Sequence, residues 1–326
     1  MISVIIPFFQ RSPGLLLRSV RSVLQQDPEG RVHIVITDDG SPVRAREELG
    51  PELLSSQRIT LVEQANAGPG AARNRCLDAL PPSTRYVALM DSDDIWLPGF
   101  LEHALPALAL GVDIYFCDSG RREQPQSRFL WHADERLNVR AEGRRSVKGG
   151  KHLYWFEEPF FDFMLHRSNI LGPSSTVYRL DCAPRLRFDP SLYNGQDRLF
   201  KIKLARTVRT VSFCDQVLCQ EGEGVNIFDS AAWGSRKGLR LASSYISLHK
   251  KILGELDLDP AQTAFVRTRV EAARLDFAAK ALHLISTPSE MDWTLFVRTV
   301  AADPRVISTA LRHKLARLTE NRRELK

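Results

Sequence analysis

The sequence is poor in cysteine and has no long hydrophobic run. Its five cysteines among 326 residues form no Cys-x-x-Cys pair, which argues against a zinc site or a disulfide scaffold and fits free thiols in a reducing compartment. No stretch approaches the roughly 18 consecutive apolar residues of a membrane-spanning helix. Residues 1–7 carry neither a basic segment nor a cleavage site, so a strand is expected there instead of a signal peptide. These absences together predict a cytoplasmic globular protein.

Two phosphate-binding signatures are missing as well. No Gly-x-x-x-x-Gly-Lys-Ser/Thr segment occurs, which excludes a P-loop, and Arg73 stands where a Rossmann Gly-x-Gly-x-x-Gly segment needs its third glycine. Basic residues are scattered without a recognisable nucleic-acid motif, so nucleic acid is not an expected partner. The net charge of +6 still favours anionic ligands in general, nucleotides and phospholipid head groups included.

The first third of the chain alternates strand-like and helix-like runs. Alternation at this spacing predicts an α/β fold in which helices flank a mostly parallel sheet. The expected strands are 3–7, 32–37, 59–63, 85–90 and 112–117, and the expected helices are 14–26, 43–55, 68–80 and 98–109.

The remainder divides into a polar, aromatic-rich middle and a helical tail. The middle is expected to contain a helix at 197–205 and short strands at 174–179, 207–213 and 216–220, and helices follow from about residue 235 to the end. The predicted domains are a sheet domain, 1–225, with halves 1–118 and 119–225, and a helical C-terminal region, 235–326.

An acidic string follows the most apolar of these strands. Tyr86–Met90 is apolar throughout, which suits a strand buried on both faces, and Asp91-Ser92-Asp93-Asp94 follows it directly. Three carboxylates at the end of a buried strand repel each other, and a divalent cation such as Mg²⁺ or Mn²⁺ would relieve that repulsion. The string therefore predicts a metal–phosphate site, although a solvated turn or a helix cap uses the same residue types.

Four short segments lie at the ends of the first four predicted strands. In a parallel sheet these segments meet at one edge, where the ligands of open α/β sheets bind. Asp38 or Asp39 suits a base or ribose hydroxyls, Gly68 and Gly70 open a helix whose N-terminus favours anions, and Arg73 could reach a phosphate. Taken singly, the same residues also fit a turn, a loop and a surface charge. The four segments are Pro7-Phe8-Phe9, Asp38–Ser41, Asn66–Asn74 and Asp91–Asp94.

With these segments in this order, the N-terminal third of the chain resembles the family 2 glycosyltransferases of the GT-A fold. The resemblance implies an inverting transferase of polysaccharide biosynthesis that uses a nucleoside-diphosphate sugar, often a UDP-sugar, with Mn²⁺ or Mg²⁺. It also implies that Asp93 holds the metal, that Asp39 faces the base and that Asp91 lies on the ribose side. The residues it implies for nucleotide-sugar binding are Pro7, Phe8, Asp39, Asn66, Gly68, Arg73, Asp91 and Ser92.

The resemblance also indicates a catalytic base. Transfer to a sugar hydroxyl needs a base, and the family carries it in a Gly-Glu-Asp element that opens a helix. Here Gly195-Gln196-Asp197 stands in that place, so Asp197 is the expected base and Gln196 replaces the usual glutamate. Without the resemblance, a helix N-cap is the favoured interpretation of Asp197.

The expected acceptor is a glycan or a lipid-linked saccharide, bound by the variable middle of the chain. Segment 221–226 fits either a lid over the donor or a turn between domains. The basic, amphipathic segment 298–326 fits peripheral contact with an anionic membrane, or packing on its own domain or on the partner in a homo-oligomer. The candidates for acceptor binding are Trp131, Tyr154, Trp155, Phe160, Phe161 and His166.

Two other functions fit the same residues. A metal-dependent nucleotidyltransferase also uses a carboxylate-held metal on an α/β sheet, but it attacks a phosphate instead of a sugar carbon. A non-catalytic nucleotide-sugar-binding module fits because a single carboxylate, Asp197, replaces the usual pair.

Overall fold

The computed structural model describes residues 1–121, 127–222, 224–225, 231–287 and 289–312. The chain forms two compact units. We call Met1–Pro190 with Asp197–Val225 the sheet unit, and Ser191–Gln196 with Asn226–Lys326 the helical unit. Residues 313–326 of the predicted membrane-contact segment lie outside the described residues, as do residues 223 and 226 of the segment expected to be a lid or a turn.

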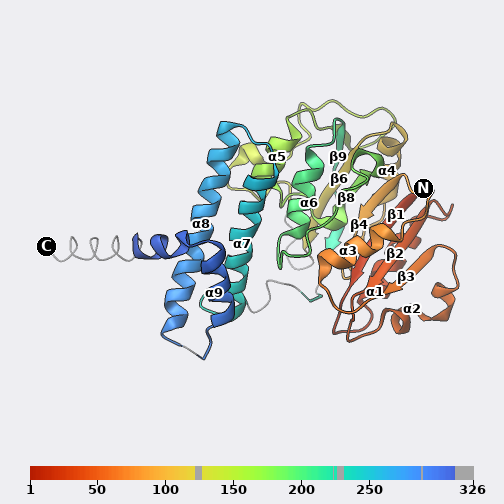
Figure 1. Ribbon diagram of the computed structural model, residues 1–326. Coiled ribbons are helices and arrows are strands. Elements are labelled where there is room, and N and C mark those ends of the chain that lie inside the picture. The colour runs from red at the N-terminus through yellow and green to blue at the C-terminus, as the bar shows by residue number, and fades with distance from the viewer. Residues whose placement is uncertain (122–126, 223, 226–230, 288, 313–326) are drawn as a thin grey trace. The chain divides into compact units, whose positions relative to one another are not determined.

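Within the described residues, one nine-stranded sheet forms the centre of the sheet unit (Figure 1). The strand order is β3-β2-β1-β4-β8-β6-β9-β5, and β7 pairs with β9 beside this path. Strands β1 to β4 pair in parallel, whereas β8 runs antiparallel to both β4 and β6. The strands are β1 (Ile2–Phe8), β2 (Val32–Asp38), β3 (Ile59–Glu63), β4 (Tyr86–Leu89), β5 (Ile95–Trp96), β6 (Ile114–Arg121), β7 (Leu153–Trp155), β8 (Thr176–Arg179) and β9 (Val211–Glu221).

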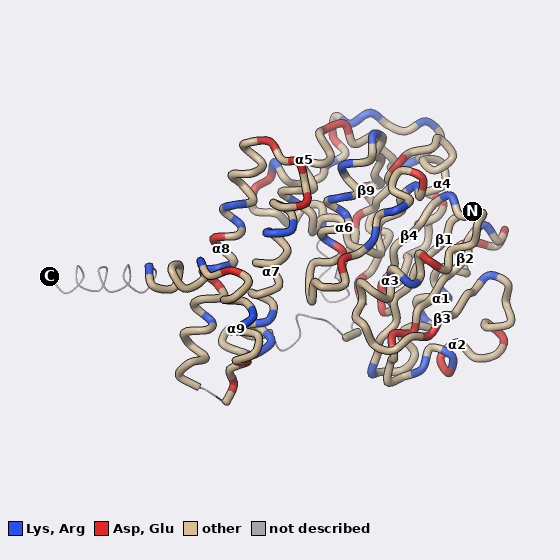
Figure 2. Tube along the Cα trace, viewed as in Figure 1, with Lys and Arg blue, Asp and Glu red and all other residues tan. Residues whose placement is uncertain are grey.

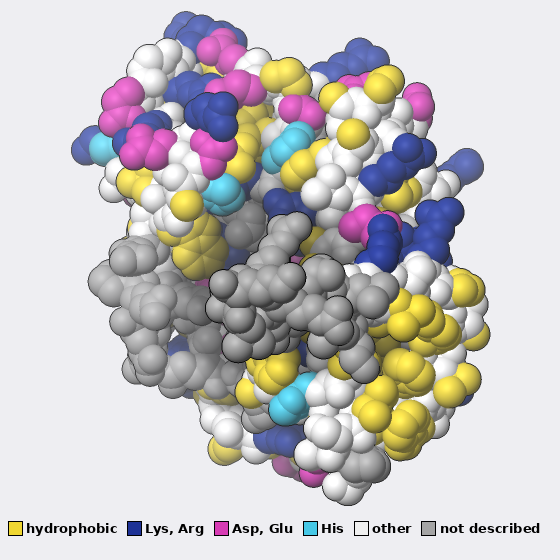
Figure 3. All heavy atoms as spheres, turned by 90° about the vertical axis from the view of Figure 1, so that its left-hand side faces the viewer, with side chains coloured by type: hydrophobic (Ala, Val, Ile, Leu, Met, Phe, Trp, Pro, Cys, Tyr) yellow, Lys and Arg dark blue, Asp and Glu magenta, His cyan; other side chains and the backbone are white. Residues whose placement is uncertain are grey.

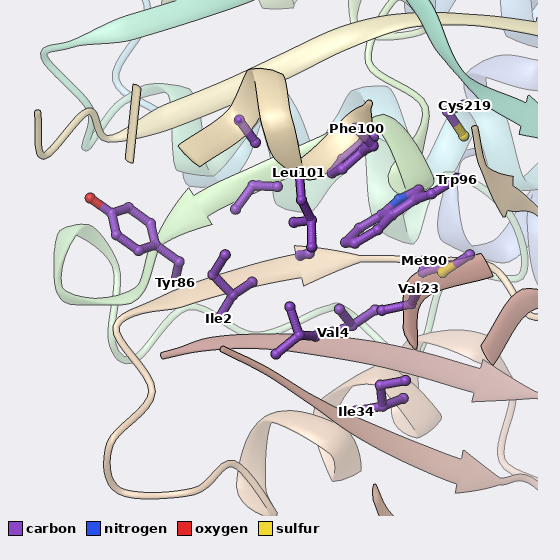
Figure 4. Packing of buried hydrophobic residues seen from close by; sticks show 14 of the residues in the cluster. Ile2, Val4, Val23, Ile34, Tyr86, Met90, Trp96, Phe100, Leu101 and Cys219 are labelled. Atoms are coloured by element: carbon purple, nitrogen blue, oxygen red, sulfur yellow. The ribbon is translucent and has the colours of Figure 1, made fainter. Parts of the chain in front are cut away.

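Helices cover both faces of this sheet, which explains why its central strands are apolar throughout. Successive side chains of a strand point to opposite faces, so Val4 of β1 joins one hydrophobic cluster and Ile5 joins the other. Helices α1, α2 and α4 contribute to the first cluster, and α3, α5 and α6 to the second. Figure 4 shows part of the first cluster, with Val4 of β1 near Leu101 of α4 and Ile34 on the adjacent strand β2. The helices are α1 (Leu15–Leu24), α2 (Ala45–Leu54), α3 (Pro69–Asp78), α4 (Phe100–Ala109), α5 (Phe160–Arg167) and α6 (Gln196–Ala205).

The predicted fold class, a GT-A type α/β sheet with a helical C-terminal region, is confirmed, and the differences lie in the middle of the chain. The two expected strands 207–213 and 216–220 form the single strand β9, because the strand continues through the polar residues Asp215 and Gln216. A register shift between β6 and β9 near Cys117 accommodates the extra residues. The sequence did not predict β5 and β7, because strands of two and three residues carry too little pattern to detect. It did not predict α5 either.

The helical unit consists of long helices around a core of its own. Its described helices are α7 (Arg236–Glu255), α8 (Pro260–Ile285) and α9 (Trp293–Ala302). Helix α8 begins with a capping box in which Asp259 accepts from the backbone of Gln262, with Pro260 at the first helical position. Arg274 of α8 forms a buried, two-pronged ion pair with Asp303 just after α9, which ties the end of α9 to α8.

Charged side chains are spread along the described chain instead of being gathered in one basic block (Figure 2). Among the described residues, no helix is both long and apolar enough to cross a bilayer. The helical unit nevertheless exposes several large apolar side chains, and Figure 3 shows hydrophobic groups gathered at its lower right, on the side where α8 and α9 lie. The exposed apolar residues of α9 and the segment after it are Trp293, Val297, Ile307 and Leu311.

Candidate functional site

The carboxyl ends of four parallel strands form one edge of the sheet. In the paired register, Phe8 at the end of β1 lies beside Asp38 of β2, and Asp38 lies beside Glu63 of β3. Strand β4 lies on the other side of β1 and points the same way. The segments that follow these strands, each singled out from the sequence, therefore start at the same edge.

Gln10 joins three of these segments, although the sequence analysis did not single it out. Its backbone N–H donates to Ser41 Oγ over 2.9 Å, and Ser41 Oγ donates back to the Gln10 carbonyl over 3.0 Å. Its side-chain Nε2 donates to Ser92 Oγ over 3.0 Å. The signal available in the sequence was a polar residue directly after the Phe8-Phe9 pair, where a buried strand has just ended.

Asp38 has a structural role. Its carboxylate is buried and accepts the backbone N–H groups of Ser41 and Ala45, over 2.8 and 2.9 Å. Ala45 is the first residue of α2, so Asp38 supplies an acceptor for one of the free N–H groups at that helix start. The sequence left open whether Asp38 or Asp39 contacts the nucleoside. Both carboxylate oxygens of Asp38 already accept backbone N–H groups.

Asp39 holds the loop that leads into α3. Its Oδ1 accepts from Gln64 Nε2 at 2.7 Å and from the Ala67 N–H at 2.8 Å, and its Oδ2 accepts from the Gly68 N–H at 2.9 Å. Asn66 donates from its side chain to the Asp39 carbonyl. Gly68 has φ of 88°, a conformation that other residues adopt only with strain. The structure thus brings Asp39, Asn66 and Gly68 together in one loop.

Arg73 places a buried cation at the same edge. Its Nη2 lies 2.5 Å from Asp91 Oδ1, and its guanidinium lies over the Phe188 ring at 5.4 Å from the ring centroid. Only 5% of the Arg73 side chain is exposed, and its Nε and Nη1 have no hydrogen-bond partner among the described residues. Buried guanidinium N–H groups without partners carry a desolvation cost that an anionic ligand would remove.

The acidic turn after β4 is tightly packed. Ser174 Oγ donates to Asp94 and also accepts the Asp91 N–H over 2.9 Å. Burial, followed by the charges of Asp91 and Asp93, raises the pKa of the Asp94 carboxyl to about 8. Burial and the Asp91 charge also raise the pKa of Asp93. Asp94 therefore supports the turn, while burial and the Asp91 charge on Asp93 outweigh the opposing effects of the Gly224 N–H and the Arg18 charge.

Asp91, Asp93 and Asp94 together suit a hard divalent cation. Its positive charge would offset both the burial and the Asp91 charge that raise the pKa of Asp93. Among the described residues, no three His, Cys, Asp or Glu side chains are arranged to hold a metal by themselves. A cation bound here would need further oxygen ligands, such as substrate phosphates.

The segment after β9 lies against the acidic turn. The Gly224 N–H donates to Asp93 Oδ2 over 2.7 Å, and the Gly222 N–H donates to Asp94 Oδ1 over 2.8 Å. The Val225 N–H donates to Gln10 Oε1 over 3.0 Å. A Cβ on Gly222 would lie 1.9 Å from the Asp93 carbonyl oxygen, so only glycine fits there.

Asp197 lies in the first turn of α6, one residue beyond the helix start at Gln196. Its Oδ2 is 3.0 Å from Lys201 Nζ. Burial alone would raise its pKa, but the positive charges of Lys201 and Arg73 outweigh that effect and lower the pKa of Asp197 to about 2. The influence of Arg73 shows that Asp197 and the Arg73–Asp91 pair belong to one electrostatic environment.

Most of the aromatic candidates for acceptor binding serve in packing. Phe160 is buried in the core, Tyr154 packs on Phe213, and Arg206 covers Phe161 at 3.8 Å from the ring centroid. Trp155 is covered by Arg145 at 5.2 Å, and His166 Nδ1 is hydrogen-bonded to the Asp162 carbonyl. Trp131 differs, since 41% of it is exposed and its ring lies against the Arg128 guanidinium.

Comparison with known proteins agrees with this geometry. The sequence model described as "Glycosyl transferase family 2" matches residues 3–169. A curated relative, the succinoglycan biosynthesis protein ExoW of Rhizobium meliloti, is 28% identical over 98% of this chain and 99% of its own length.

Solved structures share the fold. The S. aureus TarS fragment 1–349 in complex with UDP-GlcNAc superposes with a TM-score of 0.59 at 18% identity, covering 86% of this chain and 81% of that one. The mannosyltransferase PcManGT from Pyrobaculum calidifontis, in complex with GDP-Man and Mn²⁺, gives a TM-score of 0.54 at 16% identity over 98% and 86% of the two chains.

Proposed function

The chain belongs to glycosyltransferase family 2, and from this premise we propose that it transfers a sugar from a nucleoside-diphosphate sugar, a UDP-sugar in the first place, to a hydroxyl of a glycan or lipid-linked acceptor with inversion. The observation that carries the proposal is the buried Arg73 at the sheet edge. It is paired with Asp91 but keeps two nitrogens, Nε and Nη1, without described partners, next to the turn that contains Asp93. A buried cation beside partly buried carboxylates suits a diphosphate together with a divalent cation.

The nucleoside would bind where the strand ends and the loop before α3 meet. Pro7, Phe8 and Asp39 would line the base pocket, and Asp91 with Ser92 would contact the ribose. Asp39 already fixes Asn66 and Gly68 through its own oxygens. Its contribution to base binding would therefore come largely through the shape of this loop.

Asp93 would hold the divalent cation, Mn²⁺ or Mg²⁺, and a cation bound there neutralises the charge that develops on the leaving diphosphate. The relatedness to a fold that includes a Mn²⁺-containing complex supports this choice. Arg73 would bind the same diphosphate from the α3 side, where the helix N-terminus adds favourable N–H dipoles.

Asp197 would act as the base. The acceptor oxygen forms a bond to the anomeric carbon, its proton passes to an oxygen of Asp197, and the bond from the anomeric carbon to the diphosphate breaks with its electron pair on the leaving group. Attack from the face opposite the diphosphate inverts the anomeric centre. Asp197 is ionised at neutral pH, as a proton acceptor must be.

Trp131 would carry the acceptor sugar on its exposed ring face, because it alone among the six candidates is largely exposed in the described structure. The exposed apolar side chains of α9 and the basic segment that follows would touch an anionic membrane, which suits a lipid-linked acceptor. The expected site of action is the cytoplasmic face of that membrane.

A thermal-shift screen tests the donor proposal. UDP-GlcNAc, UDP-glucose, GDP-mannose and dTDP-glucose would be added with and without Mn²⁺, and at least one should raise the melting temperature in a metal-dependent way, since a ligand bound only by the native state stabilises it. Asp93→Asn keeps an oxygen acceptor for the Gly224 N–H but should lose the metal-dependent part of the shift.

Asp181→Asn is the matched control, because that side chain is 75% exposed and should leave the shift unchanged. Product analysis separates the chemistries: transfer releases a nucleoside diphosphate, whereas a nucleotidyltransferase would release pyrophosphate. If no donor gives a metal-dependent shift, the proposed function is wrong.

A further inference from the structure

Lys201 is a buried lysine that the reaction described above does not use. It lies on α6 one turn after Asp197, and its side chain is only 4% exposed. Its Nζ contacts Asp197 Oδ2 at 3.0 Å and donates to the Leu171 carbonyl. Burying an ammonium group costs several kcal/mol unless it is paired, and apolar residues usually fill such a position with equal or better stability.

The surroundings of Lys201 are rich in positive charge. Burial lowers its pKa, the Asp197 carboxylate opposes this, and the charges of Arg128 and Arg73 lower the pKa further. Arg128 is itself paired with Glu221, and Arg73 with Asp91. The charges of two arginines add to the cost of burying this ammonium group. Its only described carboxylate contact is Asp197.

We propose that Lys201 is a positioning residue for the transfer reaction: it holds the Asp197 carboxylate through Oδ2, keeps it ionised, and leaves the other oxygen to take the acceptor proton. This inference rests on the proposed function. Lys201 is anchored on its other side by the Leu171 backbone carbonyl, which holds Nζ independently of the substrate.

The consequence concerns the ionisation of the base. Lys201, together with Arg73, holds the pKa of Asp197 at about 2, against the effect of burial. Without the ammonium, burial would be opposed mainly by Arg73, whose own charge is shared with Asp91. The pKa of Asp197 should then rise, and the carboxylate should become protonated as the pH falls toward 6.

The test compares Lys201→Gln, which can still donate to the Leu171 carbonyl but carries no charge, with Lys201→Arg, which keeps the charge. The readout is kcat/KM for release of nucleoside diphosphate, measured between pH 5 and 9. The substrate is the donor that is turned over fastest among UDP-GlcNAc, UDP-glucose, GDP-mannose and dTDP-glucose. For Lys201→Gln we expect kcat/KM to be about tenfold lower at pH 6 than at pH 8, beyond any change in the wild type. Lys201→Arg should restore the wild-type profile, and donor affinity should stay within about threefold.

Lys203→Met on the same helix is the control and should keep the wild-type profile. Identical pH profiles for the wild type and Lys201→Gln overturn the inference alone. Absence of donor turnover in the wild type overturns the proposed function and the inference with it.

A direct titration keeps the inference testable even if Lys201→Gln does not fold. The ¹³C NMR signal of the Asp197 carboxyl carbon is assigned by comparison with Asp197→Asn. In the wild type this signal should show an ionised carboxylate down to about pH 4, below which most carboxylates protonate. Titration of Asp197 above that pH would overturn the inference.

Discussion

Asp38 and Asp39 are adjacent in the sequence, yet their carboxylates hold different segments. Asp38 accepts two backbone N–H groups near the start of α2, and Asp39 accepts two from the loop before α3. The sequence predicted that one of the pair would serve the nucleoside. It could not distinguish them, because the choice depends on which backbone N–H groups the fold brings within reach.

Replacing Asp38 should therefore reduce stability more than donor binding. Asp38→Asn leaves one oxygen and places an amide N–H₂ toward a backbone N–H, so we expect a loss of about 1–3 kcal/mol in the free energy of unfolding. Urea denaturation measures this loss. Folded Asp38→Asn should keep the donor-induced thermal shift; unchanged stability with a lost shift would instead make Asp38 a ligand contact.

At the scale of elements, the end of β9 and the turn after β4 form one packed structure. Gly222 and Gly224 bring their backbone N–H groups onto Asp94 and Asp93. The acidic string was visible in the sequence, as was the glycine-rich segment more than a hundred residues later. Their contact was not visible, because it depends on β9 reaching the same edge of the sheet as β4.

A methyl group on Gly222 should break this contact. Gly222→Ala would place Cβ 1.9 Å from the Asp93 carbonyl oxygen, so the segment must move and Asp94 loses an N–H donor. We expect the free energy of unfolding to fall by about 1–3 kcal/mol, together with a weaker metal-dependent donor shift.

Gly254→Ala provides the control for Gly222→Ala. The site in α7 has open space and ordinary backbone angles, so alanine should raise the stability by about 0.5–1 kcal/mol. Equal behaviour of the two variants in urea denaturation would contradict the close contact at Gly222.

At the scale of the whole molecule, the sheet unit and the helical unit each bury charged side chains, but in different surroundings. The sheet unit buries Arg73 and Lys201 and partly buries Asp197 beside the proposed site, where these ionised groups would serve the reaction. The helical unit buries the Arg274–Asp303 pair far along the chain from those residues, where it ties helices together. The basic segment from residue 298 divides into a described part, residues 298–312, which includes Asp303, and residues 313–326.

Membrane contact should depend on the second of these parts. Residues 313–326 carry five Lys or Arg against two Glu, and their removal spares the Arg274–Asp303 pair. The full chain should co-sediment with vesicles that contain anionic lipid, and less so after this deletion or at high salt. Neutral vesicles are the control; equal binding with and without the segment would contradict the proposal.

The sequence alone determined the order of the first four strands and of the helices that follow them, together with the four short segments after those strands. It could do so because buried parallel strands are continuous apolar runs, and because chain order places their carboxyl ends together. Tertiary structure decided which N–H groups Asp38 and Asp39 each accept, which contacts Gln10 and Gly222 make at the sheet edge, and that Lys201 pairs with Asp197. Those outcomes depend on burial and on charges brought together from distant parts of the chain, and neither is a property of any single segment.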